Sequence, residues 1–164
     1  MLINKGETLF LQGDMGDLYH LKTGLLKVIR TQSNGDCVLL NLLVPGEIFP
    51  HHSLISPKEY HGTVIALLPS EVERIPIHDW YQSLIDKPEK NKEVAAILQD
   101  NLRKMQKRIE MTTLPSKKRI PFFRDWISMY GKNYEMEEIL TQEEIGQFLG
   151  MSRETVNRHM RRES

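Results

Sequence analysis

The most informative part of this sequence is its carboxyl-terminal stretch, LTQEEIGQFLGMSRETVNRHMRRES, residues 140–164. Thr141 is followed three residues later by Glu144, which is the spacing of a capping box, so a helix is predicted to begin directly after Thr141. Gly150 suits the left-handed backbone that ends a helix, and Ser152 can cap a second helix only two residues later. The stretch therefore predicts two helices joined by a short turn, which is a helix-turn-helix.

Apolar residues give each of these two helices a face that can pack against a core. Ile145 and Leu149 point inward from the first helix, and Val156 and Met160 point inward from the second. Two helices joined by so short a turn must cross steeply. Gly146 and Val156 are the small and β-branched residues that would let them approach.

The exposed face of the second helix carries Arg153, Glu154, Asn157 and Arg158 near its amino end. An arginine can donate two hydrogen bonds to guanine, and a glutamate can accept one from cytosine, so these side chains suit the reading of base edges in a G·C-containing site. The alternative is a solvated charged face on a terminal helix. Because the caps, the turn glycine and the charges agree with one another, we favour double-stranded DNA as the partner.

Charge is divided unevenly along a chain whose net charge is zero. Residues 1–86 hold 6 Lys+Arg against 10 Asp+Glu, a net of −4, whereas residues 87–164 hold 16 against 12, a net of +4. The basic half is the one expected to face phosphate. No segment approaches the roughly 18 apolar residues of a membrane span, and no secretory leader is evident, so we expect a cytoplasmic protein that does not enter a membrane.

The chain offers little that would support catalysis or a cofactor. It has no P-loop, no dinucleotide fingerprint and no nucleophile with a base at motif spacing, so we do not expect an enzyme. Its one cysteine, Cys37, can form neither an internal disulfide nor a multi-thiolate cluster, and it is expected to be a small buried residue of a strand. No cofactor and no metal are expected.

The first 78 residues predict short strands separated by glycines, the pattern of an all-β barrel or jelly roll. Asn34-Gly35 indicates a hairpin between two of these strands. The strands are expected around residues 9–11, 18–21, 25–29, 38–43 and 64–68.

Residues 91–114 change to a helical period without Gly or Pro. The residues that set the period are Val94, Leu98, Leu102, Met105 and Ile109. The helix could pack on its own barrel, but so narrow an apolar stripe favours pairing with the same helix of a second copy. A shorter helix is predicted at about 117–130.

The whole chain resembles the Crp/Fnr transcription regulators. The resemblance rests on KGETLFLQGDMGDLYHLKTGLLKV at 5–28, VPGEIF at 44–49 and SRETVNRHM at 152–160, together with the long helix between them. It implies an α+β fold with three parts: a cyclic-nucleotide-binding-like β jelly-roll barrel, a dimerisation helix and a helix-turn-helix of the winged-helix type. We expect these parts at residues 1–90, 91–114 and 115–164.

The resemblance also implies a function and residue roles. The chain would bind DNA as a homodimer, with half-sites about one helical turn apart and similar to a TGTGA element, and would have RNA polymerase as a further partner. Arg153, Glu154 and Arg158 take the base-contacting roles. Phosphate contacts are expected at Thr141, Gln142, Ser152 and Thr155.

Two departures from the family pattern stand out. Where nucleotide-binding members carry a glutamate for the ribose and an arginine followed by Ser or Thr for the cyclic phosphate, this sequence has His51 and Tyr60-His61. Losing the arginine removes the group shaped for a bidentate phosphate contact, so cyclic nucleotide binding is not expected. The second departure is at the end, where the sequence stops at Ser164 and the expected β-hairpin wing does not follow.

His51, His52 and His61 leave one alternative open. If their rings converged near the barrel pocket, the chain would be a metal, haem or small-molecule sensor whose barrel ligand controls DNA binding. Adjacent His51 and His52 on an extended strand would point to opposite faces, and no carboxylate motif accompanies them. Ordinary polar loop residues are therefore the favoured interpretation.

Overall fold

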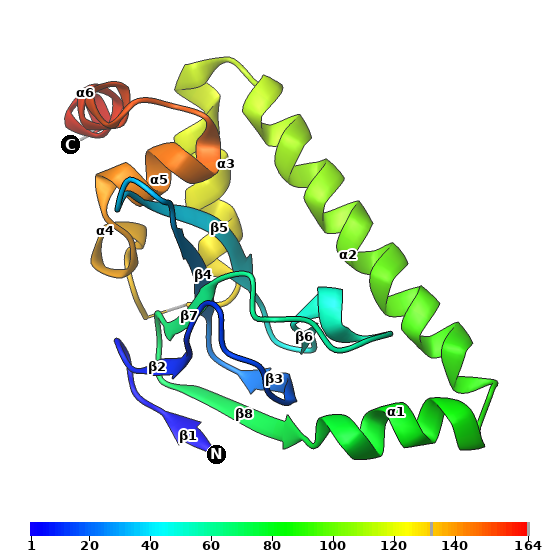
Figure 1. The fold of residues 1–164 in the computed structure, drawn as a ribbon. Coiled ribbons are helices and arrows are strands. Elements are labelled where there is room, and N and C mark those ends of the chain that lie inside the picture. The colour runs from blue at the N-terminus through cyan, green and yellow to red at the C-terminus, as the bar shows by residue number, and fades with distance from the viewer. Residues whose placement is uncertain (132, 164) are drawn as a thin grey trace.

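The computed structural model describes residues 1–131 and 133–163 (Figure 1). The strands are β1 Leu2–Ile3, β2 Thr8–Phe10, β3 Leu18–Thr23, β4 Leu26–Thr31, β5 Cys37–Leu43, β6 Ile48–Phe49, β7 Thr63–Ala66 and β8 Ser70–Ile75. The helices are the 3-10 turn His51–Ser53, α1 Ile77–Asp86, α2 Lys90–Thr113, α3 Ser116–Ser128, α4 Met136–Ile139, α5 Gln142–Leu149 and α6 Arg153–Glu163.

The strands form two antiparallel four-stranded sheets, in the orders β1-β8-β3-β6 and β2-β7-β4-β5. Buried residues from both sheets make one cluster between them, in which Leu21, Val72 and Leu26 are fully buried. The all-β prediction is confirmed for this half, as two facing sheets. Three strands are not predicted from the sequence: β1 and β6, which have two residues each, and β8, half of whose SEVERI residues are charged.

The β4–β5 hairpin lies where Asn34-Gly35 predicts it. Thr31 pairs with Cys37, and Gly35 has a φ of +89°, which favours glycine. The expectation for Cys37 is wrong, because its side chain is exposed. It is the first residue of β5, next to the hairpin loop.

Helix α2 matches its predicted bounds within one residue at each end, but one of its apolar residues belongs elsewhere. Val94 is fully buried in its own protomer, in a cluster with Leu18, Leu54 and Trp80 of the preceding segments. Val94 is therefore not part of an exposed seam. The cluster depends on α1, a helix that the sequence analysis does not predict, because its apolar residues continue directly from β8 and α1 has only ten residues.

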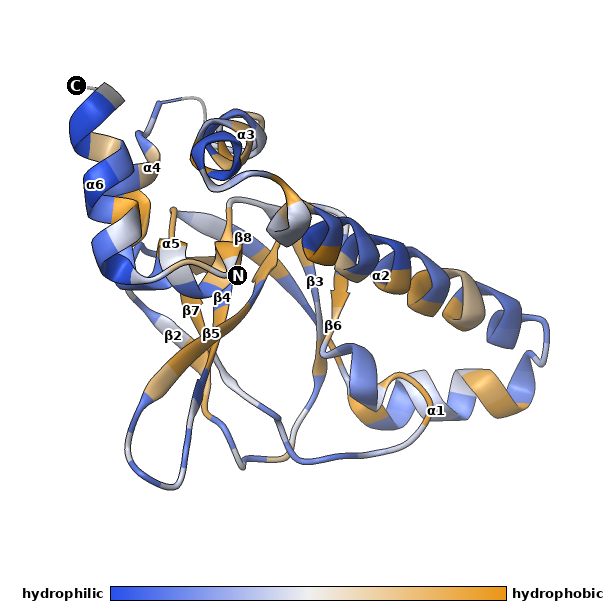
Figure 2. Ribbon diagram, turned by 90° about the horizontal axis from the view of Figure 1, so that it is seen from above, coloured by the Kyte–Doolittle hydropathy of each residue, from blue (hydrophilic) through white to orange (hydrophobic). Residues whose placement is uncertain are grey.

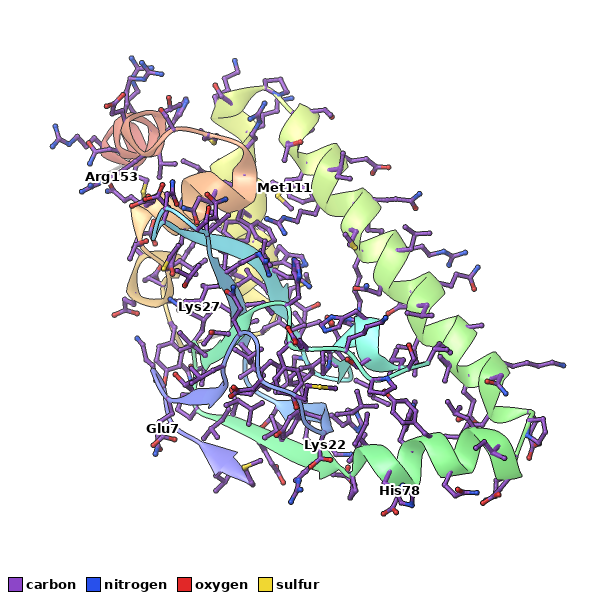
Figure 3. All side chains as sticks on the ribbon, in the orientation of Figure 1. Glu7, Lys22, Lys27, His78, Met111 and Arg153 are labelled. Carbon is purple, nitrogen blue, oxygen red and sulfur yellow. The ribbon has the colours of Figure 1, made fainter. Side chains whose placement is uncertain are left out.

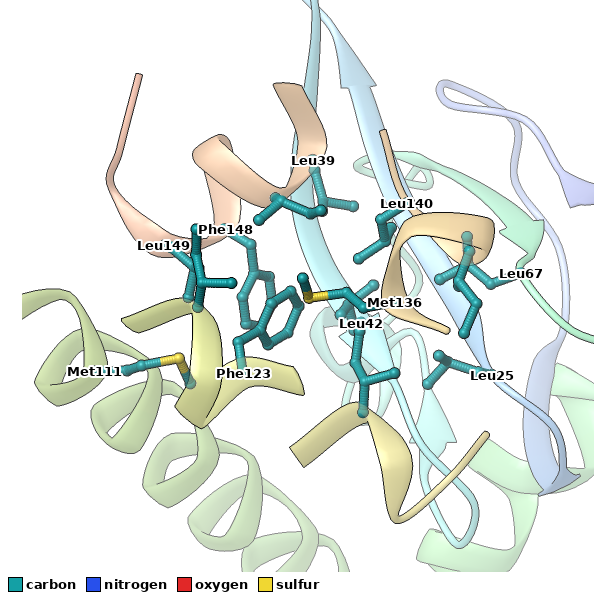
Figure 4. Packing of buried hydrophobic residues seen from close by; sticks show 14 of the residues in the cluster. Leu25, Leu39, Leu42, Leu67, Met111, Phe123, Met136, Leu140, Phe148 and Leu149 are labelled. Atoms are coloured by element: carbon teal, nitrogen blue, oxygen red, sulfur yellow. The ribbon is translucent and has the colours of Figure 1, made fainter. Parts of the chain in front are cut away.

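The helices that follow α2 pack on the sheet that contains β4 and β5. Phe123 of α3 stacks on Phe148 of α5 with ring centroids 4.7 Å apart, and both rings belong to the cluster that includes Leu39 and Leu42 of β5 (Figure 4). The predicted helix at 117–130 is confirmed as α3. Barrel, long helix and helix-turn-helix thus share one core. Within the described residues, no helix is both long and apolar enough to cross a membrane.

Candidate nucleic-acid interface

Helix α5 begins with the predicted capping box. The Thr141 hydroxyl oxygen accepts a hydrogen bond from the Glu144 backbone N–H at 3.1 Å, and the Glu144 carboxylate accepts one from the Thr141 N–H at 2.9 Å. Two backbone donors at the start of the helix are thereby satisfied. Gly150 ends the helix with a φ of +66°, as the sequence predicts.

The turn between α5 and α6 requires glycine at position 146. A Cβ atom there would collide with the carbonyl oxygen of Met151, whose own N–H donates to the Gly146 carbonyl at 2.8 Å. The close approach expected at Gly146 is therefore confirmed, but the neighbour is the turn backbone rather than Val156. Val156 is fully buried beneath the turn, in the core cluster that also holds Ile145 and Leu149.

Helix α6 presents a polar face at the edge of the molecule (Figure 2). Ser152 caps it, because its hydroxyl oxygen accepts from the Thr155 N–H at 3.1 Å. Arg153, Glu154 and Arg158 are all exposed, and Figure 3 shows Arg153 projecting on the side away from α2. The three side chains expected to reach base edges are thus free of the protein core and lie on one helix.

Asn157 differs from its expected place on the exposed face. Its side chain is half-buried, and its amide nitrogen donates to the Gln142 side-chain oxygen at 3.0 Å. This hydrogen bond links the start of α6 to the start of α5, so the two amino ends are held in a fixed relation. Asn157 therefore holds Gln142, for which a phosphate contact is expected, in position.

Contacts that the sequence analysis misses hold α5 against the barrel. The Gln147 side chain accepts from the Leu39 N–H at 2.7 Å and donates to the Cys37 carbonyl at 3.2 Å, so it pairs with the edge of β5 as a short strand would. Lys27 of β4 forms an ion pair with Glu144 at 2.5 Å. Each pair is separated by more than a hundred residues, and no periodic pattern reports such distant contacts.

The remaining apolar residues of the long helix lie exposed. Leu102 and Ile109 are 56% and 63% exposed, and Leu98 and Met105 are exposed on the same side of the helix. A groove of about 720 Å³, here called the barrel-side groove, runs between this side of α2 and the two sheets. Large apolar side chains gathered on one face in this way are typical of an interface.

Tyr60, where the resemblance leads us to expect an arginine in nucleotide-binding members, is a buried phenol. The Tyr60 ring stacks on Phe10 with centroids 3.9 Å apart, and its hydroxyl donates to the Asp17 carbonyl at 2.8 Å. Burial raises the pKa of Tyr60, so the phenol stays neutral. The guanidinium of Arg30 donates to the His61 carbonyl at 2.6 Å.

His51 lies in a short helical turn beside Lys104 and the buried Glu47, and not on an extended strand as expected. It belongs to the 3-10 turn His51–Ser53, and its Nε2 lies 3.6 Å from Glu47, whose side chain is only 4% exposed. Lys104 of α2 approaches the same carboxylate at 3.3 Å. Burial lowers the pKa of His51 to about 4 and raises the pKa of Glu47. In the described part of the chain, no three His, Cys, Asp or Glu side chains gather as a metal site would need.

Acid should destabilise the protein through His51. Below pH 6.5 the unfolded chain binds a proton at this histidine that the folded chain does not bind until about pH 4, so stability is lost as the pH falls between these values. We expect roughly 2 kcal/mol less stability at pH 5 than at pH 7 from this group. Urea unfolding of the wild type and of His51→Gln at both pH values isolates the contribution of His51 to the pH dependence of stability. Glu47, whose pKa is raised, changes stability with pH in the opposite sense, but it does so in both proteins. Equal pH dependence of the two proteins would contradict the assignment.

Two family models match the chain. Residues 2–86 match the cyclic nucleotide-binding domain, and residues 124–162 match region 4 of sigma-70. The first match covers both sheets and α1, and the second covers the helix-turn-helix.

Relatives and solved structures agree with these matches. The CRP-like cAMP-activated global transcriptional regulator of Mycobacterium tuberculosis is 27% identical over 94% of this chain and 72% of the relative. The Cyclic AMP receptor protein of Thermus thermophilus is 26% identical over 96% of this chain and 73% of the relative. A CRP-family transcriptional regulator of Thermus thermophilus has the same fold, with a TM-score of 0.78 at 23% identity over 99% of this chain and 85% of that one.

Proposed function

Since the chain belongs to the cyclic nucleotide-binding domain family and is a transcription regulator of the Crp/Fnr type, we propose that it binds a palindromic DNA site as a homodimer without cyclic nucleotide. The observation that carries the proposal is the recognition helix α6, capped by Ser152 and exposing Arg153, Glu154 and Arg158. Acting on DNA, the regulator would work in the cytoplasm, with RNA polymerase as a further partner.

The proposed contacts follow from where each side chain lies. Arg153, Glu154 and Arg158 read base edges in the major groove, because they are the exposed side chains on the first two turns of α6 that can donate to guanine or accept from cytosine. Phosphate contacts come from the amino ends of the two helices, where backbone N–H groups favour an anion. The residues at these ends are Thr141, Gln142, Ser152 and Thr155.

Asn157 has a different role in this proposal from base reading. Its amide is bonded to Gln142, so it positions the phosphate-contacting end of α5 relative to the base-reading end of α6. Bases and phosphates of one half-site are then contacted by a single rigid unit.

The homodimer forms through the exposed seam of α2, made of Leu98, Leu102, Met105 and Ile109. Spacings of 4, 3 and 4 residues match the repeat of a two-helix coiled coil. Two copies related by a two-fold axis place two α6 helices on two half-sites, which is why a palindrome is expected.

Cyclic AMP should not bind with useful affinity. Tyr60 fills the place of the arginine with a neutral buried phenol, and burial keeps His51 uncharged at neutral pH. Calorimetric titration of the full chain with cyclic AMP should therefore give no measurable heat of binding at micromolar nucleotide. Micromolar binding with a phosphate-dependent enthalpy would show that another cation, such as Lys58, replaces the arginine.

The proposed function is tested directly by fluorescence anisotropy of labelled duplexes, with no nucleotide added. A duplex with two TGTGA-like half-sites about one helical turn apart should bind much more tightly than a scrambled duplex of the same composition. Equal affinity for both duplexes over a range of salt concentrations would leave only non-specific phosphate binding and would contradict the proposal.

A further inference from the structure

A second cavity lies where the long helix joins the helix-turn-helix. It measures about 650 Å³ and is lined by α2, α3 and β5, and we call it the hinge cavity. Its volume falls in the range of small-molecule sites, roughly 300–1,000 Å³. Because its walls come from both sides of the joint at Leu114, an occupant would contact the dimerisation helix and the DNA-binding segment together.

The wall supplied by α3 and α5 is aromatic. Phe122, Trp126 and Tyr130 of α3 line it, and Phe148 of α5 closes it. Phe122 is 52% exposed, although its neighbour Phe123 is fully buried. A half-exposed phenylalanine beside three other rings offers stacking surface that the protein itself leaves uncovered.

The wall supplied by α2 holds a cation, the guanidinium of Arg108. The Arg108 guanidinium lies 4.2 Å from the centre of the Phe148 ring and donates one hydrogen bond, to the Leu40 carbonyl. Across the described residues it makes no ion pair, whereas Lys104 of the same helix has both Glu47 and Asp100 within 4 Å. Burial lowers the pKa of Arg108.

We propose that the hinge cavity binds a small molecule with a planar apolar body and one anionic group, and that Arg108 holds the anion. A guanidinium has five N–H donors, and one of them is used here. Arg108 can therefore donate to a carboxylate, sulfonate or phosphate oxygen without breaking its hydrogen bond to Leu40. The apolar body stacks on the rings of Phe122 and Trp126.

The hinge cavity shares Met105, Arg108 and Phe148 with the barrel-side groove, but the rings of α3 line the hinge cavity and not the groove. The groove is bordered by His51, His52 and His61 and by three seam residues, so in the proposed dimer it is the place where the partner helix approaches. Met105 is the one seam residue that lines the hinge cavity.

An occupant of the hinge cavity would act on α5, and this part of the inference rests on the proposed function. Arg108 stacks on Phe148 of α5. Gln147, the residue before Phe148, accepts a hydrogen bond from the Leu39 N–H and so joins α5 to β5. Drawing the guanidinium toward an anion changes its contact with α5, and with it the position of the DNA-binding helices relative to α2.

The test uses 8-anilino-1-naphthalenesulfonate, an aromatic sulfonate, titrated into the full chain and followed by energy transfer from tryptophan. Trp126 lines the cavity, whereas Trp80 is buried in another cluster. We expect Arg108→Met to weaken binding by about tenfold, the effect of losing one charge-assisted hydrogen bond. The matched control Arg103→Met, on the solvent face of the same helix, should bind as the wild type does.

Two further variants make the result decisive. Phe122→Ala, at a half-exposed position of the hinge cavity, should weaken binding several-fold even if Arg108→Met does not fold by circular dichroism. His52→Ala alters only the barrel-side groove and should leave the affinity unchanged. Wild-type affinity in both cavity variants, or its loss in His52→Ala, would overturn the proposal. Because the titration contains no DNA, its outcome is independent of whether the chain binds DNA.

Discussion

Leu102→Glu is expected to convert a dimer into a monomer and to weaken binding to a palindromic duplex by roughly 10²–10⁴-fold, the range that linking two binding modules commonly contributes. Leu102 lies in the middle of the exposed α2 seam, between Leu98 and Met105. In the paired helix two glutamates would face each other in an apolar interface, losing burial and adding repulsion. Sedimentation velocity measures the assembly, and anisotropy of the labelled duplex measures the affinity.

The matched control is Ala96→Glu, which adds the same charge to an exposed position on the solvent face of α2, away from the seam. It should sediment as a dimer and bind as the wild type does. A monomeric wild type would reject the seam, and an unchanged dimer in Leu102→Glu would move the interface to another surface.

Arg153→Ala and Arg158→Ala are each expected to cost about 1–3 kcal/mol on the preferred site and to flatten discrimination at one base pair. Both side chains are exposed on α6, so their removal should leave the core intact. Binding to duplexes that carry every single-base change in one half-site gives the discrimination position by position.

Arg162→Ala is the control for these two variants, because Arg162 is exposed on the last turn of α6, far from the base-reading end. It should weaken all sequences alike and reduce the dependence of the affinity on salt. A changed preference in Arg162→Ala, or an unchanged one in Arg153→Ala, would contradict the assignment of the base-reading residues.

Local signals in the sequence predict the helix-turn-helix well. The Thr141–Glu144 box, Gly150 and Ser152 act through neighbours three residues away or fewer, and the structure places all of them as expected. Strands are predicted less completely, since β1 and β6 are too short to show an alternation.

Contacts between segments that are distant in the sequence determine the features that local patterns do not predict. Val94 fits the periodicity of the seam, yet α1 and the 3-10 turn region bury it, and neither element is predicted. Asn157 has the spacing of a base-reading residue, but its amide is taken by Gln142 across the turn. Gln147 and Arg108 gain their partners from strand β5, and nothing in their immediate neighbourhood indicates this.

Recognition of a palindrome through α6 without cyclic nucleotide can be measured by selection from random duplexes with the full chain and no added nucleotide. We expect enrichment of two inverted, G·C-containing half-sites whose centres are about one helical turn apart. Enrichment of no motif, or of a single unpaired half-site, would contradict it.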